Sequence, residues 1–194
     1  MKFLAIITMS IAPCFGSIIF SDNFDASLGA TQLNADIPGW NEVNGTIDYI
    51  RNGAFGLACL GGAGGCIDLD GSTTDAGDLV STTPFNLLAG NTYVLTYWIS
   101  GNQRSGTDTL TVSFGGQTNT HTAIASSDPF TQFSITVTPL ANTSSGISFS
   151  HAGGDNLGIM LDSVELDEQT GIPEPATMAM LAAGLAATAL LRRR

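Results

Sequence analysis

The sequence predicts an all-β domain, a jelly-roll β-sandwich, between Ile18 and Glu168. Short segments of alternating apolar and polar residues recur along this region, and each is typical of a strand with one buried face. Clusters of Gly, Asn, Asp, Ser and Thr separate them and predict turns. No long segment has a convincing helical period. Short strands at this spacing favour a sandwich or jelly roll, and the region has the length of one domain.

The predicted strands follow one another along this domain. Four segments alternate and are predicted to be half-buried, namely residues 46–51, 66–70, 110–114 and 133–137. Three more continuous apolar strands are predicted at residues 93–99, 146–149 and 158–166. Alternation in the second segment places Asp68 and Asp70 on the same side of a strand, which we expect to face solvent.

The last residues of the chain form a tail with three parts. Pro173, Glu174 and Pro175 come first, an apolar run covers 176–191, and Arg192, Arg193 and Arg194 end the chain. As a helix the run is roughly 24 Å long, just enough to span a bilayer if the arginines reach the far interface. The arginines favour a cytoplasmic end, which leaves the domain outside.

This order of elements resembles the PEP-CTERM sorting tail of exported bacterial proteins. The resemblance implies that residues 169–194 are a linker and sorting tail, processed by an exosortase-type membrane enzyme near the Pro-Glu-Pro element. The protein would then be anchored in the inner membrane at least transiently, and afterwards reach the cell surface or extracellular matrix. The alternative is an ordinary C-terminal membrane anchor that is not cleaved.

The beginning of the chain also predicts export. Lys2 precedes an apolar stretch, and small residues follow at Gly16 and Ser17, which is the layout of a signal peptide over residues 1–17. Secretion machinery is therefore an expected partner. Cys14 offers an alternative as the acylated residue of a lipoprotein signal, although Pro13 before it fits that motif poorly.

The charge of the chain restricts its partners. Apart from Lys2 and the terminal arginines, only Arg51 and Arg104 oppose 17 acidic residues. Nucleic acid is therefore excluded as an expected partner, because binding its phosphates needs basic side chains. Divalent cations and neutral or basic ligands are compatible with this charge, and so is an acidic surface that only keeps the protein soluble.

Two cysteines follow the signal peptide. Cys59 and Cys66 are separated by a glycine-rich segment that is flexible enough to bring the sulfurs together. In an oxidising envelope we predict a disulfide between them. Two free buried thiols are the alternative.

Several segments together resemble the galactose-binding-like jelly rolls of carbohydrate-binding modules. They are residues 37–40, 47–50, 67–71, 88–93 and 159–164. The resemblance implies a possible structural calcium ion held by Asp25 and Asp162, with backbone carbonyls and water as further ligands. The alternative is that both aspartates bond backbone amides at turns and strand ends.

No pattern predicts catalysis. The segment 68–75 lacks the glycine position and closing glutamate of a calcium-binding EF-hand loop, and is better explained as an aspartate-capped turn. The chain has no serine-nucleophile elbow, zinc-protease motif or phosphate loop. We therefore expect that the protein is not an enzyme, with a small polysaccharide hydrolase as the least favoured alternative.

Sugar binding would use aromatic rings with polar groups beside them. Trp40 follows a Pro-Gly turn and is the aromatic residue that we most expect to be exposed, and Tyr49 is a further candidate. Tyr97 and Trp98 are consecutive, so they point to opposite faces and one of them belongs to the core. Arg104 lies in a polar loop and can supply hydrogen bonds. The sequence predicts a non-catalytic envelope or matrix protein that contacts polysaccharide, or a structural or adhesion protein without a specific ligand.

Overall fold

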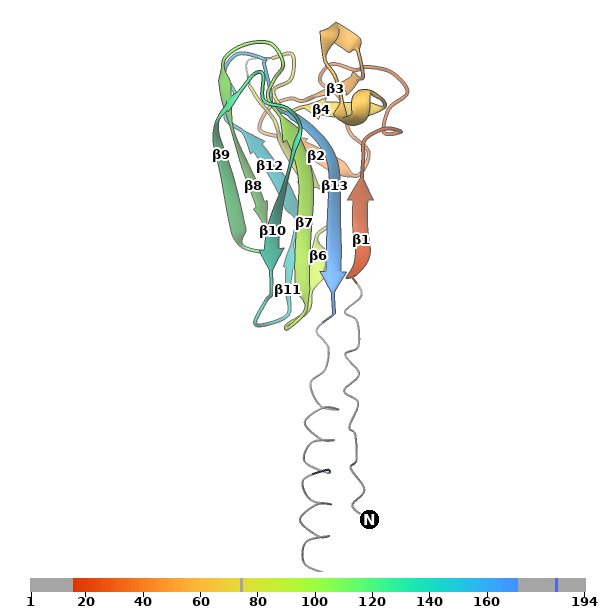
Figure 1. The fold of residues 1–194 in the computed structure, drawn as a ribbon, viewed down its shortest axis with the longest axis vertical. Coiled ribbons are helices and arrows are strands. Elements are labelled where there is room, and N and C mark those ends of the chain that lie inside the picture. The colour runs from red at the N-terminus through yellow and green to blue at the C-terminus, as the bar shows by residue number, and fades with distance from the viewer. Residues whose placement is uncertain (1–15, 74, 171–183, 185–194) are drawn as a thin grey trace, which may run out of the picture.

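The computed structural model describes residues 16–73, 75–170 and 184, and these form a β-sandwich (Figure 1). Two short 3-10 helices, η1 (Ala54–Gly56) and η2 (Leu60–Gly62), interrupt the loop between the third and fourth strands. The strands are β1 (Gly16–Asp22), β2 (Trp40–Val43), β3 (Asp48–Arg51), β4 (Gly65–Asp68), β5 (Asp78–Ser81), β6 (Phe85–Leu87), β7 (Thr92–Ser100), β8 (Thr107–Phe114), β9 (Gln117–Ala125), β10 (Thr131–Val137), β11 (Thr143–Ser145), β12 (Ile147–His151) and β13 (Met160–Gln169). The jelly-roll prediction is confirmed in its all-β character and sandwich architecture.

Two antiparallel sheets make the two layers. One has five strands in the order β2-β5-β12-β8-β9, and the other has six, with β10-β7-β13-β4-β3 in order and β1 also on β13. The long strand β13 pairs along its whole length with β7. Its other edge pairs first with β4 and then with β1. A two-stranded sheet of β6 and β11 lies beside them.

The main core lies between the two large sheets. Inward side chains alternate along the strands, as in β7, where Tyr93, Leu95 and Tyr97 are fully buried. They pack with inward residues of the opposite sheet such as Val112 and Phe149. This burial of apolar surface is the main source of stability in such a sandwich.

A second, smaller core lies on the outer face of the six-stranded sheet. The loop between β3 and β4 folds back over this face and buries Leu57 and the two cysteines against Ile50 and Met160. Both faces of β3 and β4 are therefore covered. The prediction that residues 46–51 and 66–70 are half-buried was wrong for this reason.

Asp68 at the end of β4 and Asp70 just after it show the same effect. Asp68 is 1% exposed and Asp70 is 0% exposed, so the prediction that they face solvent was wrong. Alternation had correctly placed Asp68 away from the main core, on the face of Cys66. Loops from other parts of the chain cover that face, and Asp68 Oδ1 accepts hydrogen bonds from the amides of Asp70 and Gly158.

The two ends of the sandwich differ. Gly16, the first residue of β1, pairs with Gln169, the last residue of β13, at the lower end in Figure 1. The opposite end, here called the distal end, carries the loops 101–106, 126–130 and 152–159, which follow β7, β9 and β12. About 30 Å of strand separates the ends, since β13 rises ~3.3 Å per residue.

The described residues begin within the predicted signal peptide. Gly16 and Ser17, assigned to the signal peptide from sequence, are the first residues of β1 and pair with Gln169 and Glu168 of β13. The rest of the predicted signal peptide, the sorting motif and nearly all of the apolar span lie outside the described residues. Within the described part of the chain, no helix has the length and apolar character needed to cross a membrane.

Candidate functional site

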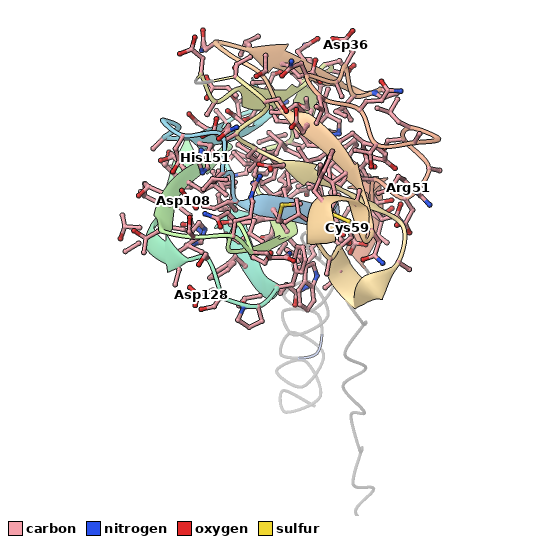
Figure 2. All side chains as sticks on the ribbon, turned by 90° about the horizontal axis from the view of Figure 1, so that it is seen from above. Asp36, Arg51, Cys59, Asp108, Asp128 and His151 are labelled. Atoms are coloured by element: carbon pink, nitrogen blue, oxygen red, sulfur yellow. A yellow bond between two sulfur atoms is a disulfide. The ribbon has the colours of Figure 1, made fainter. Side chains whose placement is uncertain are left out.

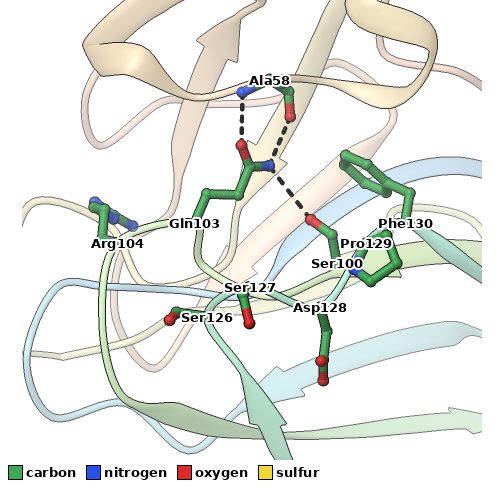
Figure 3. Close-up of a pocket in the computed structure, with 9 residues that line it drawn as sticks. All are labelled: Ala58, Ser100, Gln103, Arg104, Ser126, Ser127, Asp128, Pro129 and Phe130. Carbon is green, nitrogen blue, oxygen red and sulfur yellow. Dashed lines mark hydrogen bonds between the residues drawn. The ribbon is translucent and has the colours of Figure 1, made fainter.

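A pocket of about 480 Å³ opens at the distal end of the sandwich (Figure 3). It lies between the β3–β4 loop, the β7–β8 loop and the β9–β10 loop. Its lining combines hydroxyl, amide, guanidinium and carboxylate groups with two apolar rings. The residues are Ala58, Ser100, Gln103, Arg104, Ser126, Ser127, Asp128, Pro129 and Phe130.

Gln103 fixes one wall of the pocket. Its side-chain Nε2 donates to the carbonyl of Ala58 at 2.7 Å, and its Oε1 accepts from the amide of Ala58 at 2.8 Å. Nε2 also lies 3.4 Å from Ser100 Oγ, as the dashed lines in Figure 3 show. Gln103 has a positive φ of 57°, which turns the loop toward Ala58. These bonds join the β7–β8 and β3–β4 loops, so the wall is preorganised.

Arg104 stands at the rim and is held by a buried acid. Its Nη2 donates to Asp68 Oδ2 at 2.5 Å, and its Nε donates to the Asn102 carbonyl at 3.3 Å. The Arg104 side chain is 30% exposed, whereas that of Asp68 is 2% exposed. Burial raises the pKa of Asp68 to about 7, although Arg104 and the amide of Asp70 both lower it. The guanidinium is thus fixed in direction and still open to solvent on one side.

The opposite wall is the β9–β10 loop. Ser127, Asp128 and Pro129 are exposed, and Ser126 and Phe130 are partly exposed. Asp128 Oδ2 accepts from the amide of Ala125 at 2.9 Å, and its own amide donates back to the Ala125 carbonyl. The loop is therefore closed by a tight turn, with hydroxyl groups and an apolar ring on its surface.

Two of the predicted sugar-binding residues are in the core. Trp40 is 4% exposed, and its Nε1 donates to Asp22 Oδ2 at 2.9 Å. Its ring packs against Phe20 and Phe149. Tyr49 is 0% exposed and donates its hydroxyl proton to the Phe24 carbonyl. The expectation that Trp40 is exposed was wrong, and neither ring can stack on a sugar.

The other two aromatic candidates divide as predicted. Tyr97 is fully buried in the main core, where its hydroxyl lies 2.8 Å from His121 Nε2. Trp98 is partly exposed on the outer face of β7. It stands two residues before Ser100, a pocket residue on the same face, and so about 7 Å along the strand from it. Of the candidates named from sequence, Arg104 lines the pocket and Trp98 lies beside it.

The predicted calcium ligands lie near one another but are bonded to the protein. Asp162 is 4% exposed and accepts from the Leu60 amide at 3.0 Å. Asp25 is exposed and accepts from the Gly65 amide at 3.2 Å. Burial, together with the charges of Asp25 and Asp22, raises the pKa of Asp162 to about 7, although the hydrogen bond from the Leu60 amide lowers it. These hydrogen bonds to backbone amides agree with the alternative interpretation of the two aspartates. Calcium binding by Asp25 and Asp162 stays a prediction.

The predicted disulfide is confirmed, with Cys59 and Cys66 bonded and their Cα atoms 5.5 Å apart. Figure 2 shows it beneath the loop at the distal end. Among the described residues, Cys59, Cys66 and Asp162 bring potential ligand atoms within 4.8 Å of one another. Because both sulfurs belong to the disulfide, this group does not offer thiolate ligands.

The sequence reasoning missed most of the pocket. Ser126, Ser127 and Asp128 were not singled out, although the run Ser-Ser-Asp-Pro is a clear turn signal. Gln103 was seen only as part of a polar loop. A turn signal shows where a loop lies, but it does not show that three distant loops meet around one cavity.

Comparison with known proteins identifies the end of the chain. Residues 171–194 match the model of the PEP-CTERM protein-sorting motif. The tail is a PEP-CTERM sorting tail. The motif indicates an exported, membrane-anchored protein that an exosortase processes. It includes the Pro-Glu-Pro element of residues 173–175 and the basic residues 192–194, as the sequence predicted. No curated protein matches the chain in sequence.

Solved structures resemble the domain in fold at low sequence identity. A cyclase from Fischerella sp. TAU is 15% identical with a TM-score of 0.57, over 81% of this chain and all of that one. The CBM22-1 xylan-binding domain of Paenibacillus barcinonensis Xyn10C is 14% identical with a TM-score of 0.51, over 83% of this chain and all of that one.

A larger enzyme contains a similar domain. The arabinose-bound MgGH51 α-L-arabinofuranosidase is 13% identical with a TM-score of 0.53, over 76% of this chain. This chain covers only 26% of that enzyme. At these identities the likeness establishes the jelly-roll fold, which hosts many unrelated functions.

Proposed function

We propose that this protein is an exported, non-catalytic surface protein whose distal pocket binds polysaccharide. The observation that carries the proposal is the composition of the pocket. A fixed guanidinium from Arg104 and the hydroxyls of Ser126 and Ser127 lie near the rings of Pro129 and Phe130. Sugars are bound by this mixture, since hydroxyls need polar partners and the carbon face of the ring needs apolar contact.

The position of the pocket supports the same proposal. The sorting tail continues from β13 at one end of the sandwich, and the pocket lies at the other end. While the tail is anchored, the distal end is directed away from the membrane toward the extracellular polysaccharide. Xylan binding by a protein of similar fold is consistent with this use of the fold, although that protein's ligand is no guide to the sugar bound here.

The absence of catalysis is part of the proposal. Among the described residues that line the pocket, Asp128 is the one with a carboxylate, and its Oδ2 accepts a hydrogen bond from the Ala125 amide within its own turn. Glycoside hydrolysis needs a pair of carboxylates that flank the scissile bond. Binding without turnover therefore fits the lining best.

The test fills the pocket without disturbing the core. Ser127 is exposed and its side chain can be enlarged, so Ser127→Trp should block the cavity of the full-length, detergent-solubilised protein. The matched control is Ser144→Trp, an exposed serine of β11 at the opposite end. Glycan-array binding should be saturable for the wild type and the control, and reduced at least about tenfold for Ser127→Trp.

Two results would contradict the proposal. Equal binding by both tryptophan variants would mean that sugars bind elsewhere, and a blank array from folded protein would favour a structural or adhesion role without a specific ligand. Release of sugar products by purified protein would contradict the non-catalytic part.

A further inference from the structure

A second group of polar side chains is buried at the distal end, apart from the pocket. His151 ends β12, Asp108 lies in β8, and Asp70 follows β4. The side chains of His151 and Asp70 are 1% and 0% exposed, and that of Asp108 is 10% exposed. Figure 2 shows His151 and Asp108 as neighbours in the view onto this end.

Three atoms of this group have no hydrogen-bond partner among the described residues. They are both carboxylate oxygens of Asp70 and Nε2 of His151. The amides of Asp155 and Asn156 lie near enough to lower the pKa of Asp70, but burial outweighs them and raises it. An unsatisfied buried polar group costs about 1–3 kcal/mol, so an added partner at this place would be stabilising.

The hydrogen bonds fix the protonation of the imidazole. Gly153 donates its amide proton to His151 Nδ1 at 3.0 Å. A neutral ring must therefore carry its proton on Nε2. Nε2 lies 3.8 Å from Asp108 Oδ1, which is too far for a hydrogen bond.

The group also lacks a positive charge. Among the described residues, Asp70 and Asp108 have His151 as their ion-pairing partner. Arg104 pairs with Asp68 instead. Buried carboxylates without a cation are costly, which favours an added cation at this place.

We propose that His151 Nε2 and Asp108 Oδ1 bind a divalent metal ion of the zinc class, and that Asp70 accepts the imidazole proton from Nδ1. The 3.8 Å between Nε2 and Oδ1 suits a shared ion. With metal–ligand bonds of about 2.1 Å, a tetrahedral ion needs these atoms about 3.4 Å apart, so a closure of about 0.4 Å suffices.

One part of the second layer around the ion is already in place. Asn102 is fully buried and its Nδ2 donates to Asp108 Oδ2 at 2.9 Å, which orients the carboxylate and leaves Oδ1 for the metal. Asp70 Oδ2 lies 3.9 Å from Nδ1 on the other side of the ring, so it must move about 1 Å closer to accept a hydrogen bond from this nitrogen. A carboxylate that accepts the second ring proton is the usual support of a metal-binding histidine.

Metal binding changes the histidine tautomer. The ion displaces the proton from Nε2, and the ring then carries its proton on Nδ1, where Asp70 replaces Gly153 as the partner. Gly153 lies in the exposed loop 152–156, which contains a second glycine and can rotate this amide away. Water supplies the remaining ligands. The imidazole favours zinc-class ions over calcium, which binds oxygen.

The test uses zinc ions and the full-length, disulfide-bonded protein in detergent. Calorimetry should show one site for the wild type and for His121→Asn, the control for the other histidine. Asp108→Asn should weaken binding by at least about tenfold and His151→Asn by more. In the wild type, imidazole nitrogen NMR shifts should change from the Nε2-protonated to the Nδ1-protonated form on zinc addition.

The NMR result keeps the test decisive if a variant fails to fold, because it needs only the wild type. The proposal is overturned if the tautomer does not change with saturating zinc, or if Asp108→Asn and the wild type bind equally. Glycan binding is a separate measurement, and neither result depends on the other.

Discussion

Replacing Arg104 by Met should destabilise the protein in a way that depends strongly on pH. The substitution keeps an apolar stem but removes the guanidinium that donates to Asp68. Asp68 is 2% exposed and keeps only its two backbone donors, Asp70 and Gly158. Its ionised form then loses its counterion in a buried place.

The size of the stability loss follows from the burial of the Arg104–Asp68 ion pair. Removing one partner of a buried ion pair costs about 3–5 kcal/mol. Because the Arg104 side chain is 30% exposed and partly solvated, we expect the lower end, about 3 kcal/mol, when Asp68 is ionised. When Asp68 is protonated, only a neutral hydrogen bond of about 1 kcal/mol is lost.

The sign of the pH dependence is fixed by the direction of the pKa shift. Burial raises the pKa of Asp68 to about 7 from 3.8, so the folded state binds more protons than the unfolded state between these values. Stability therefore falls as the pH rises through this window. Without Arg104 the pKa of Asp68 rises further, and the fall extends above pH 7.

Urea unfolding at about pH 5 and about pH 8.5 measures both effects. The variant should lose about 1 kcal/mol at the lower pH and about 3 kcal/mol at the higher pH, a difference equal to about 1.5 pKa units. Arg51→Met is the control, because Arg51 donates to the uncharged carbonyl of Asp25 and its loss should vary little with pH. An equal loss for Arg104→Met at both pH values would refute the reasoning.

Two further predictions concern the core and the disulfide. Trp40→Ala should lower the free energy of unfolding by about 3–5 kcal/mol in urea titrations. Trp98→Ala, on the outer face, should cost clearly less, and a similar cost for both would mean that Trp40 is not in the core. Replacing Cys59 and Cys66 by Ser should cost about 2.5 kcal/mol from loop-closure entropy, and reducing the wild type should cost the same. A variant as stable as the oxidised wild type would contradict this.

The strands that the sequence predicts correctly are those with an apolar period. All seven predicted segments contain a strand, from β3 to β13. The strand β9 was missed because its residues are mostly polar and exposed, with Thr118 and Thr120 typical of them. Its pairing with β8 through the turn at Gly115 and Gly116 makes it a strand, and this hydrogen bonding leaves no apolar period in the sequence.

Burial was predicted less well than strand position. Trp40 follows a Pro-Gly turn among polar residues, which locally favours exposure. In the fold it begins β2, pairs with Ser81 and packs against rings from other strands. Asp68 was placed on the correct face of β4, yet that face is covered by segments distant in the chain. Alternation gives the direction of a side chain, but the cover over that direction comes from elsewhere.

The sequence by itself determined the features that depend on neighbouring residues. These are the all-β character, the disulfide across a short glycine-rich segment, and the sorting tail at residues 171–194. Only the tertiary structure decided which polar groups come together. Ser100, Arg104 and Ser127 meet at one pocket, and Asp70 meets His151, because strands running to the same end of the sandwich bring their loops together. That proximity arises from long-range strand pairing, which leaves no local pattern in the sequence.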